Sequence, residues 1–286
     1  MLFNKMSFSG TAAAVCFLTL LAAGCVNITS SILNQNGLDK LGRGDYDGAS
    51  KDFSSALKQD PKMTAAYVNL GRARVELEDY NGAIQNLNIA LDLDPKNPQA
   101  YMTRAQAENG LGNYTAAIRD CNLVLKFTPD SAQAYNERGF AQYSMGDLSP
   151  AAEDYNAAIR LNKAFAQAYN NRGMVKNDTK AFFSAVDDFT MALRIDPKMA
   201  VAFNNRAYSK LYLGDFKGAA ADCSNAIVLK PRMGEALINL GVAEMKLNDK
   251  KSALESLSNA LKIGVDTTNT FLIGRCTNLI SNFADK

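Results

Sequence analysis

Arginine and aspartate recur together at a fixed spacing, and an arginine facing a carboxylate forms an ion pair or binds an anionic partner. Four arginines stand 34 residues apart, and each has an aspartate 16 residues further on. The pairs are Arg104 and Asp120, Arg138 and Asp154, Arg172 and Asp188, and Arg206 and Asp222. Where Leu70 or Leu240 replaces the arginine, the aspartate is also replaced, which predicts structural ion pairs. A row of arginines that binds a partner is the alternative.

The residues that most enzymes need for catalysis are missing or scattered. Histidine, the commonest general base and transition-metal ligand, does not occur in the 286 residues. The five cysteines show no C-x-x-C spacing of the kind found in zinc or redox sites, and the sequence has no glycine-rich phosphate loop. We therefore predict a protein without enzymatic activity, catalytic residues, metal or cofactor. Cys121, Cys223 and Cys276 are expected to be free, buried thiols.

The charge of the chain is nearly balanced. Lysine and arginine number 31 against 29 aspartate and glutamate residues, and no run of basic residues interrupts the sequence. Domains that bind nucleic acid usually carry a basic patch or stripe. A nucleic-acid partner is therefore not expected.

The N-terminal segment has the pattern of a secretion signal. Lys5 precedes an apolar stretch over residues 11–23, and small residues follow before Cys25. The stretch resembles a lipobox, where bacterial lipoprotein signal peptidase cleaves and the new N-terminal cysteine carries lipid. We predict a signal peptide over 1–24, lipidation of Cys25 and a short tether over 25–29. An uncleaved membrane anchor is the alternative, although a spanning helix needs roughly 20 apolar residues.

A 34-residue period runs through the rest of the chain. The prolines Pro61, Pro95, Pro129, Pro197 and Pro231 mark it, and Lys163 stands at the missing position. The period gives seven repeats: 30–63, 64–97, 98–131, 132–165, 166–199, 200–233 and 234–267. Within each repeat, apolar residues recur at spacings of three and four, which predicts two amphipathic helices. Residues 268–286 have the pattern of one closing helix.

The repeats share residue types at fixed internal positions. Position eight is glycine or alanine, position twenty is alanine, and position four is usually aromatic. This pattern resembles the tetratricopeptide repeat family, and residues 134–139 are similar to its bacterial variant AYxxRG. The resemblance implies an all-α, right-handed α-solenoid of about seven helix-turn-helix repeats with a C-terminal capping helix. Residues 178–181 depart from the pattern, because a glycine turn is expected there.

In this family the first helices of successive repeats line a concave groove, and the resemblance assigns positions two, five, six, nine and twelve to it. The asparagines at these positions are Asn69, Asn136, Asn170, Asn171, Asn204, Asn205 and Asn239. The other groove residues are Phe140, Tyr143, Met174, Tyr208, Leu211 and Arg72. Because an amide both donates and accepts, we predict an asparagine ladder that binds the backbone of an extended peptide. Simple solvation of these asparagines on a helix face is the alternative.

These features predict a membrane-anchored protein-interaction scaffold of the bacterial cell envelope. Val26 rather than aspartate follows the lipidated cysteine, which favours the periplasmic face of the outer membrane. The expected partners are envelope proteins or extended peptide segments. Similar lipoproteins assemble outer-membrane complexes and pili, or hold hydrolases together. A structural envelope protein that self-assembles as a homo-oligomer, without a peptide ligand, is the alternative.

Overall fold

The computed structural model describes residues 28–284. The predicted signal peptide, Cys25 and the first part of the tether therefore lie outside the described residues. Within 28–284 all regular secondary structure is helical, which confirms the predicted all-α class. No helix in that range combines the length and the apolar composition that crossing a bilayer requires. The chain divides into two units, the first ending at Pro129 and the second beginning at Asp130.

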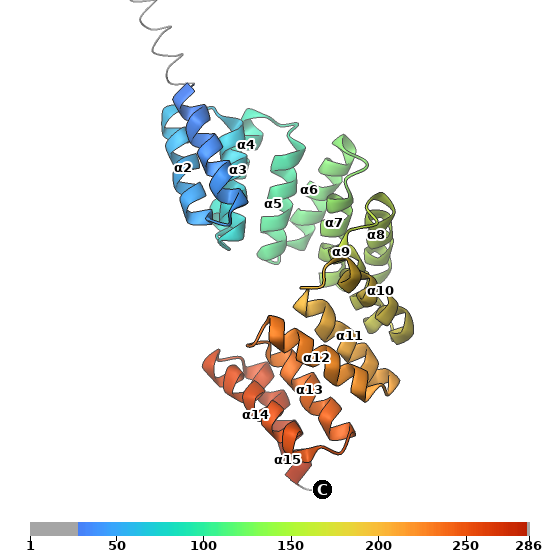
Figure 1. Ribbon diagram of the computed structural model, residues 1–286. Helices are drawn as coiled ribbons and strands as arrows, with labels where there is room; N and C mark the ends of the chain where they lie inside the picture. The colour runs from blue at the N-terminus through green and yellow to red at the C-terminus, as the bar shows by residue number, and fades with distance from the viewer. Residues whose placement is uncertain (1–27, 285–286) are drawn as a thin grey trace, which may run out of the picture. The chain divides into compact units, whose positions relative to one another are not determined.

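The first unit consists of helices that follow one another in antiparallel pairs (Figure 1). Its helices are residues 28–42, α2 (Tyr46–Gln59), α3 (Thr64–Glu76), α4 (Tyr80–Leu93), α5 (Pro98–Gly110) and α6 (Tyr114–Phe127). We name the members of each pair the first helix and the second helix. Successive first helices also contact each other, as α3 and α5 do.

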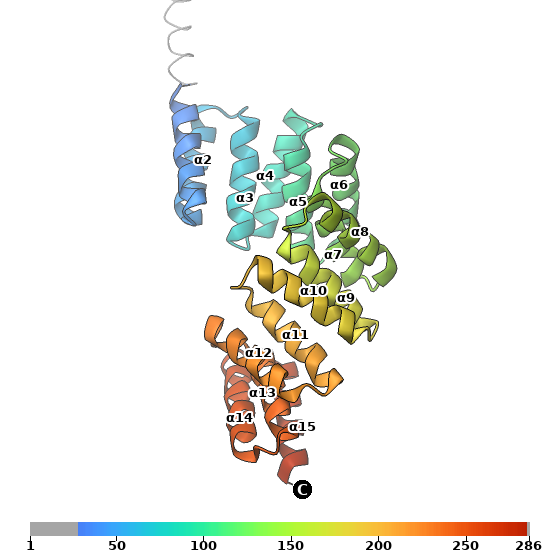
Figure 2. The same ribbon diagram turned by 45° about the vertical axis from the view of Figure 1, so that its right-hand side comes forward.

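The second unit continues the same pairing and ends with one additional helix. Its helices are α7 (Ala132–Ser144), α8 (Leu148–Leu161), α9 (Ala166–Asp178), α10 (Phe182–Ile195), α11 (Ala200–Leu213), α12 (Phe216–Leu229), α13 (Gly234–Lys246), α14 (Lys250–Asp266) and α15 (Thr270–Ala284). The first helices α7, α9, α11 and α13 each contact the next one in the series, and α13 contacts α15. Figure 2 shows α13, α14 and α15 side by side at the C-terminal end.

Polar residues next to the helices determine where several of them begin. Asp215 accepts a hydrogen bond from the Gly218 amide at 2.9 Å and so caps α12, and Asp79 caps α4 in the same way. Asn97 caps α5 and is followed by Pro98, whose fixed φ suits the first helical position. These capping side chains therefore determine the first residues of α4, α5 and α12.

The turn between the first and second helix of each pair uses a left-handed residue at position fifteen. Gly214 has φ of 80°, and glycine also occupies this position in three other repeats. Glu78, Lys180 and Asn248 adopt the same region, with φ of 59°, 61° and 69°. The unusual sequence of residues 178–181 therefore keeps the common turn, although a side chain at Lys180 makes this conformation less favourable.

Inside each pair, position eight of the first helix packs against position twenty-four of the second helix. A Cβ atom added to Gly173 would lie 2.7 Å from the Phe189 ring, so only glycine leaves room for that ring. In the sixth repeat the residues are Ala207 and Cys223, which pack in one buried cluster. The small alanine methyl group therefore accompanies a small partner, and glycine accompanies a large one.

The helix α15 covers the apolar end of the last pair. Asn269 caps it by accepting a hydrogen bond from the Leu272 amide at 3.0 Å. Leu272 and Cys276 are buried against Leu237 and Leu257. A repeat array exposes an apolar face at its end, and α15 removes that face from water.

Candidate partner-binding surface

The structure brings all four predicted arginine and aspartate pairs together, each between the first and the second helix of one repeat. Arg104 donates Nε to Asp120 Oδ2 at 2.7 Å and Nη2 to Oδ1 at 2.8 Å. The other three pairs have the same two-bond geometry, namely Arg138 with Asp154, Arg172 with Asp188, and Arg206 with Asp222. All four aspartates are buried, which makes each carboxylate dependent on its arginine.

Each arginine is also held by neighbours other than its aspartate. The Arg104 guanidinium lies over the Tyr101 ring at 5.4 Å, and Arg206 lies over Phe203 at 5.6 Å. Nη1 of Arg104 donates to Asn88 of the preceding repeat at 2.7 Å. The hydrogen bond to Asp120, opposed by burial, raises the pKa of Arg104 above its ordinary value. These arginines therefore join helices within and between repeats.

Lysines form a second set of ion pairs that the sequence analysis did not identify. Lys176 lies 2.7 Å from Asp188, and Lys210 lies 2.8 Å from Asp222. Lys40 lies 2.7 Å from Asp52 in the first repeat, where no arginine is present. The signal was a lysine 12 residues before the aspartate in these three repeats.

The asparagines hydrogen-bond to one another across neighbouring first helices. Asn205 donates to Asn170 at 3.1 Å, Asn170 donates to Asn171 at 3.2 Å, and Asn171 donates to Asn136 at 3.1 Å. This amide chain connects α11, α9 and α7. Asn239 likewise donates to Asn204 at 2.9 Å, and in the first unit Asn69 donates to Asn34 at 3.1 Å.

The predicted asparagine ladder therefore needs correction at four positions. Asn136, Asn170, Asn204 and Asn239 are buried, so a ligand on the surface does not reach them. Their side chains satisfy each other because a buried amide without a partner costs about 1–3 kcal/mol. Asn69, Asn171 and Asn205, all at position six, keep part of their surface exposed, whereas Asn239 at the same position is buried.

The predicted apolar groove residues divide into two groups. Tyr143 and Leu211 at position twelve are partly buried, and each packs against a core cluster that its own repeat forms with the next one. Phe140, Met174 and Tyr208 at position nine lie on α7, α9 and α11; Phe140 is 36% exposed, and Met174 and Tyr208 are partly buried. We name the surface that these three residues share the inner face of the second unit. Arg72 is exposed on α3 in the first unit.

An aromatic cluster at the edge of the inner face was not predicted from the sequence. Tyr212 is 61% exposed, stacks on Phe182 at 4.6 Å between ring centroids, and contacts Tyr208 through both hydroxyl groups at 3.2 Å. Burial raises the pKa of Tyr208 to about 12, and the hydrogen bond to Tyr212 acts in the same direction. Position thirteen is aromatic in this repeat only, so the periodic pattern carried no signal for it.

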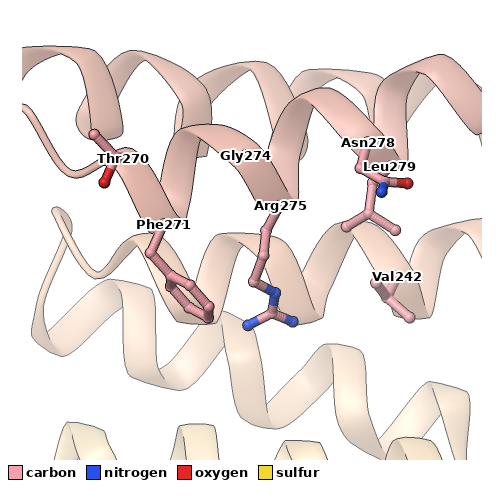
Figure 3. A pocket seen from close by; sticks show the side chains of 7 residues that line it. All are labelled: Val242, Thr270, Phe271, Gly274, Arg275, Asn278 and Leu279. Carbon is pink, nitrogen blue, oxygen red and sulfur yellow. The ribbon is translucent and has the colours of Figure 1, made fainter.

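An open groove of about 440 Å³ lies between α13 and α15 (Figure 3). Its lining residues are Val242, Thr270, Phe271, Gly274, Arg275, Asn278 and Leu279. In Figure 3 the side chains of Phe271 and Arg275 leave α15 on the same side, and Val242 approaches from α13. The guanidinium carbon of Arg275 lies 5.7 Å from the centre of the Phe271 ring. We name this site the C-terminal groove.

The three cysteines of the described residues lie in the core and not on these surfaces. Cys121, Cys223 and Cys276 are free and buried, and burial raises the pKa of Cys223 to about 12. The thiol therefore stays protonated at neutral pH, which makes it a poor nucleophile. Within residues 28–284 no group of three or more metal-ligating side chains is found.

Comparisons with solved structures reproduce the repeat architecture. A chain of the APC/C hetero-tetramer Cut9-Hcn1 aligns with a TM-score of 0.73 at 15% identity, over 81% of this chain and only 44% of that one. A tetratricopeptide repeat protein from Parabacteroides merdae gives 0.65 at 19% identity, over 88% and 98% of the two chains. PilF from Pseudomonas aeruginosa gives 0.63 at 17% identity, over 74% and 96%. At these identities the similarity concerns the fold alone.

The sequence itself matches a family. No curated protein sequence matches the chain significantly. Two models of the tetratricopeptide repeat family match it, one over residues 40–107 and the other over 136–200 and 204–264. These segments make up about two thirds of the 286 residues, so the chain belongs to the tetratricopeptide repeat family.

Proposed function

We propose that this chain is a protein-interaction scaffold of the bacterial cell envelope, and that its inner face binds an extended segment of a partner protein. The tetratricopeptide repeat fold generally mediates protein–protein interaction, and proteins built from it are typically non-enzymatic. The observation that carries the proposal is the accessible aromatic surface of Phe140, Tyr208 and Tyr212 on the first helices. Aromatic side chains of this kind dominate binding energy at protein interfaces.

The arrangement on the inner face favours an extended ligand. Asn171 and Asn205 keep part of their amides exposed, and each lies on the same helix as an apolar neighbour, Met174 or Tyr208. Each of these first helices therefore presents one polar and one apolar group, and the pair repeats on the next first helix. An extended peptide likewise repeats backbone groups and side chains along its length.

The membrane attachment is supported by the sequence of the N-terminal segment. Only Val26 and Asn27 lie between Cys25 and the helix that begins the described residues. Two residues span at most about 7 Å, so a lipid on Cys25 would hold the scaffold close to the bilayer surface. Partners would then be envelope proteins at the periplasmic face of the outer membrane.

Crosslinking in native membranes tests the binding surface. The wild-type chain is compared with a Phe140→Ser, Tyr212→Ser double variant and with Phe183→Ser, which removes an aromatic that is 78% exposed on the second helix α10. We expect the double variant to lose its crosslinked partner while the Phe183→Ser control keeps it, with similar thermal unfolding for all three. Equal crosslinking by all three chains would contradict the proposal, and crosslinks only to a second copy would support self-assembly instead.

A separate experiment tests the membrane anchor. Intact-mass measurement of the membrane-extracted protein is expected to show removal of residues 1–24 and lipid on the new N-terminal cysteine. The Cys25→Ser variant should lose the lipid mass and leave the membrane fraction, because one thiol provides the attachment. An unchanged mass and fractionation of Cys25→Ser would show that Cys25 is not lipidated.

A further inference from the structure

The C-terminal groove continues the inner face. Val242, which lines the groove, occupies position nine of the seventh repeat, and Phe140, Met174 and Tyr208 occupy this position in the preceding repeats. The electrostatic effect of Arg275 reaches the same row, because Arg275 opposes the burial that raises the pKa of Tyr208. A segment lying along the inner face therefore meets the groove as it reaches α15.

Arg275 gives the groove a positive charge that no carboxylate among the lining residues neutralises. Arg172, like the other three arginines of the repeats described above, forms an ion pair with an aspartate. Arg275 forms no such ion pair within residues 28–284. Its described contact is the Phe271 ring, which leaves the hydrogen-bonding fork of the guanidinium for an incoming acceptor. A carboxylate matches that fork because it accepts two parallel hydrogen bonds.

The groove also offers apolar surface and open space beside this charge. Phe271 is 66% exposed, and Val242 and Leu279 complete the apolar lining. A Cβ atom added to Gly274 would meet nothing within 4 Å, so the space above this residue is open. The lining therefore accommodates an apolar side chain next to a carboxylate.

The distance between the two features fits an extended chain. The Arg275 guanidinium carbon and the Phe271 ring centre are 5.7 Å apart. In an extended peptide, side chains two residues apart point to the same side and are roughly 6.5 Å apart. One face of a single peptide segment therefore supplies both complementary groups.

We propose that the C-terminal groove binds an acidic–x–apolar motif within an extended segment of the partner, with an internal aspartate or glutamate on Arg275 and the apolar side chain on Phe271 and Val242. This inference rests on the proposed function of the inner face. It adds a specific sequence requirement that the aromatic surface alone does not impose.

Fluorescence anisotropy with synthetic peptide pools tests this motif. The pools have both ends capped, random flanking residues and a fixed centre of Glu-Xaa-Leu, Gln-Xaa-Leu or Lys-Xaa-Leu, and a further pool has no internal acid but an uncapped C-terminal leucine. The chain is used as wild type, as Arg275→Gln, as Gly274→Leu to fill the groove, and as Arg160→Gln. Arg160 is an exposed arginine on α8 outside the groove and serves as the matched control.

We expect the Glu-Xaa-Leu pool to bind the wild type and Arg160→Gln about tenfold more tightly than Arg275→Gln or Gly274→Leu, since a charge-assisted hydrogen bond contributes on this scale. No variant should unfold at a lower temperature than the wild type, and Gly274→Leu should unfold at a slightly higher one, because glycine is unfavourable inside a helix. Equal binding of the Glu and Gln pools, preference for the uncapped pool, or absence of any binding would overturn the motif. If Phe140→Ser, Tyr212→Ser still loses its native partner in that case, the proposed function stands and only the motif fails.

Discussion

Asp188 on α10 accepts three short contacts from α9, two from Arg172 at 2.8 and 2.6 Å and one from Lys176 at 2.7 Å. The carboxylate is buried, so loss of its charge leaves two cations without their partner. We expect Asp188→Asn to lower the free energy of unfolding by about 3 kcal/mol, the scale for breaking a buried ion pair.

The adjacent exposed carboxylate provides the control for this prediction. Asp187→Asn removes the same charge one residue away at the surface and should change stability by less than about 0.5 kcal/mol. Urea unfolding monitored by circular dichroism measures both variants. Similar stability for Asp188→Asn and Asp187→Asn would show that the pair does not stabilise the fold.

The packing of position eight against position twenty-four predicts a compensating pair of substitutions. Gly173→Ala places a methyl group against the Phe189 ring and should destabilise the chain by about 1–3 kcal/mol. In a Phe189→Cys background the same change should cost little, because the site then resembles Ala207 and Cys223. A double-mutant cycle measured by urea unfolding gives the coupling, and strictly additive effects would contradict direct packing.

The left-handed turn position favours glycine at both Lys180 and Gly214, so substitutions to and from glycine should have opposite effects on stability. Lys180→Gly should stabilise the chain by about 0.5–1 kcal/mol, because glycine adopts φ of 61° without steric cost. Gly214→Ala should destabilise it by about 1 kcal/mol, because alanine at φ of 80° is strained. Thermal unfolding of both variants checks the prediction, and effects of the same sign would contradict it.

The amide chain predicts that the buried asparagines act on stability. Asn170→Ala leaves Asn205 without its acceptor and Asn171 without its donor, so we expect a loss of about 1–3 kcal/mol. Gln167→Ala on the exposed side of the same helix should be nearly neutral. Urea unfolding compares the two variants. A neutral Asn170→Ala would show that the amide chain does not stabilise the fold.

The hydrogen bond between Tyr143 and Asp178 predicts a loss of stability in alkali. Burial, followed by this 2.7 Å hydrogen bond, raises the pKa of Tyr143 above its ordinary value. The unfolded chain therefore loses this proton first, and the contribution of Tyr143 is present below pH of about 10 and declines as the pH rises further. Urea unfolding across this range should show a shallower decline for Tyr143→Phe, and identical declines would contradict the assignment.

The repeat period was sufficient to predict the helical solenoid and the partners of its arginines. Apolar spacing defines the helices, and the joint replacement of arginine and aspartate connects the first helix of a repeat to the second. The direction of the asparagine side chains was not predictable in this way. Positions five and six are adjacent on a helix, so a small rotation of α9 decides whether Asn170 or Asn171 faces the solvent.

The sequence pattern also could not predict the contacts of residues that do not follow the 34-residue period. The position of Tyr212 is not aromatic in the other repeats, and Arg275 lies outside the repeats. A hydrogen bond relates Tyr212 to Tyr208, and the charge of Arg275 acts on Tyr208, only in three dimensions. Lys176 and Lys210 had a weak periodic signal, because the corresponding residues of the third and fourth repeats are Glu108 and Gln142.

The two packing types inside the repeats constrain the order in which one can change into the other. A repeat with Gly173 and Phe189 that gains the alanine first meets a clash with the ring, whereas shortening the aromatic residue first avoids that clash. The intermediate with glycine and cysteine then contains a cavity, and a cavity lowers stability without preventing folding in a chain with sufficient reserve. One packing type therefore changes into the other through a loosened intermediate when the aromatic residue is shortened first, and through a strained intermediate when the alanine comes first.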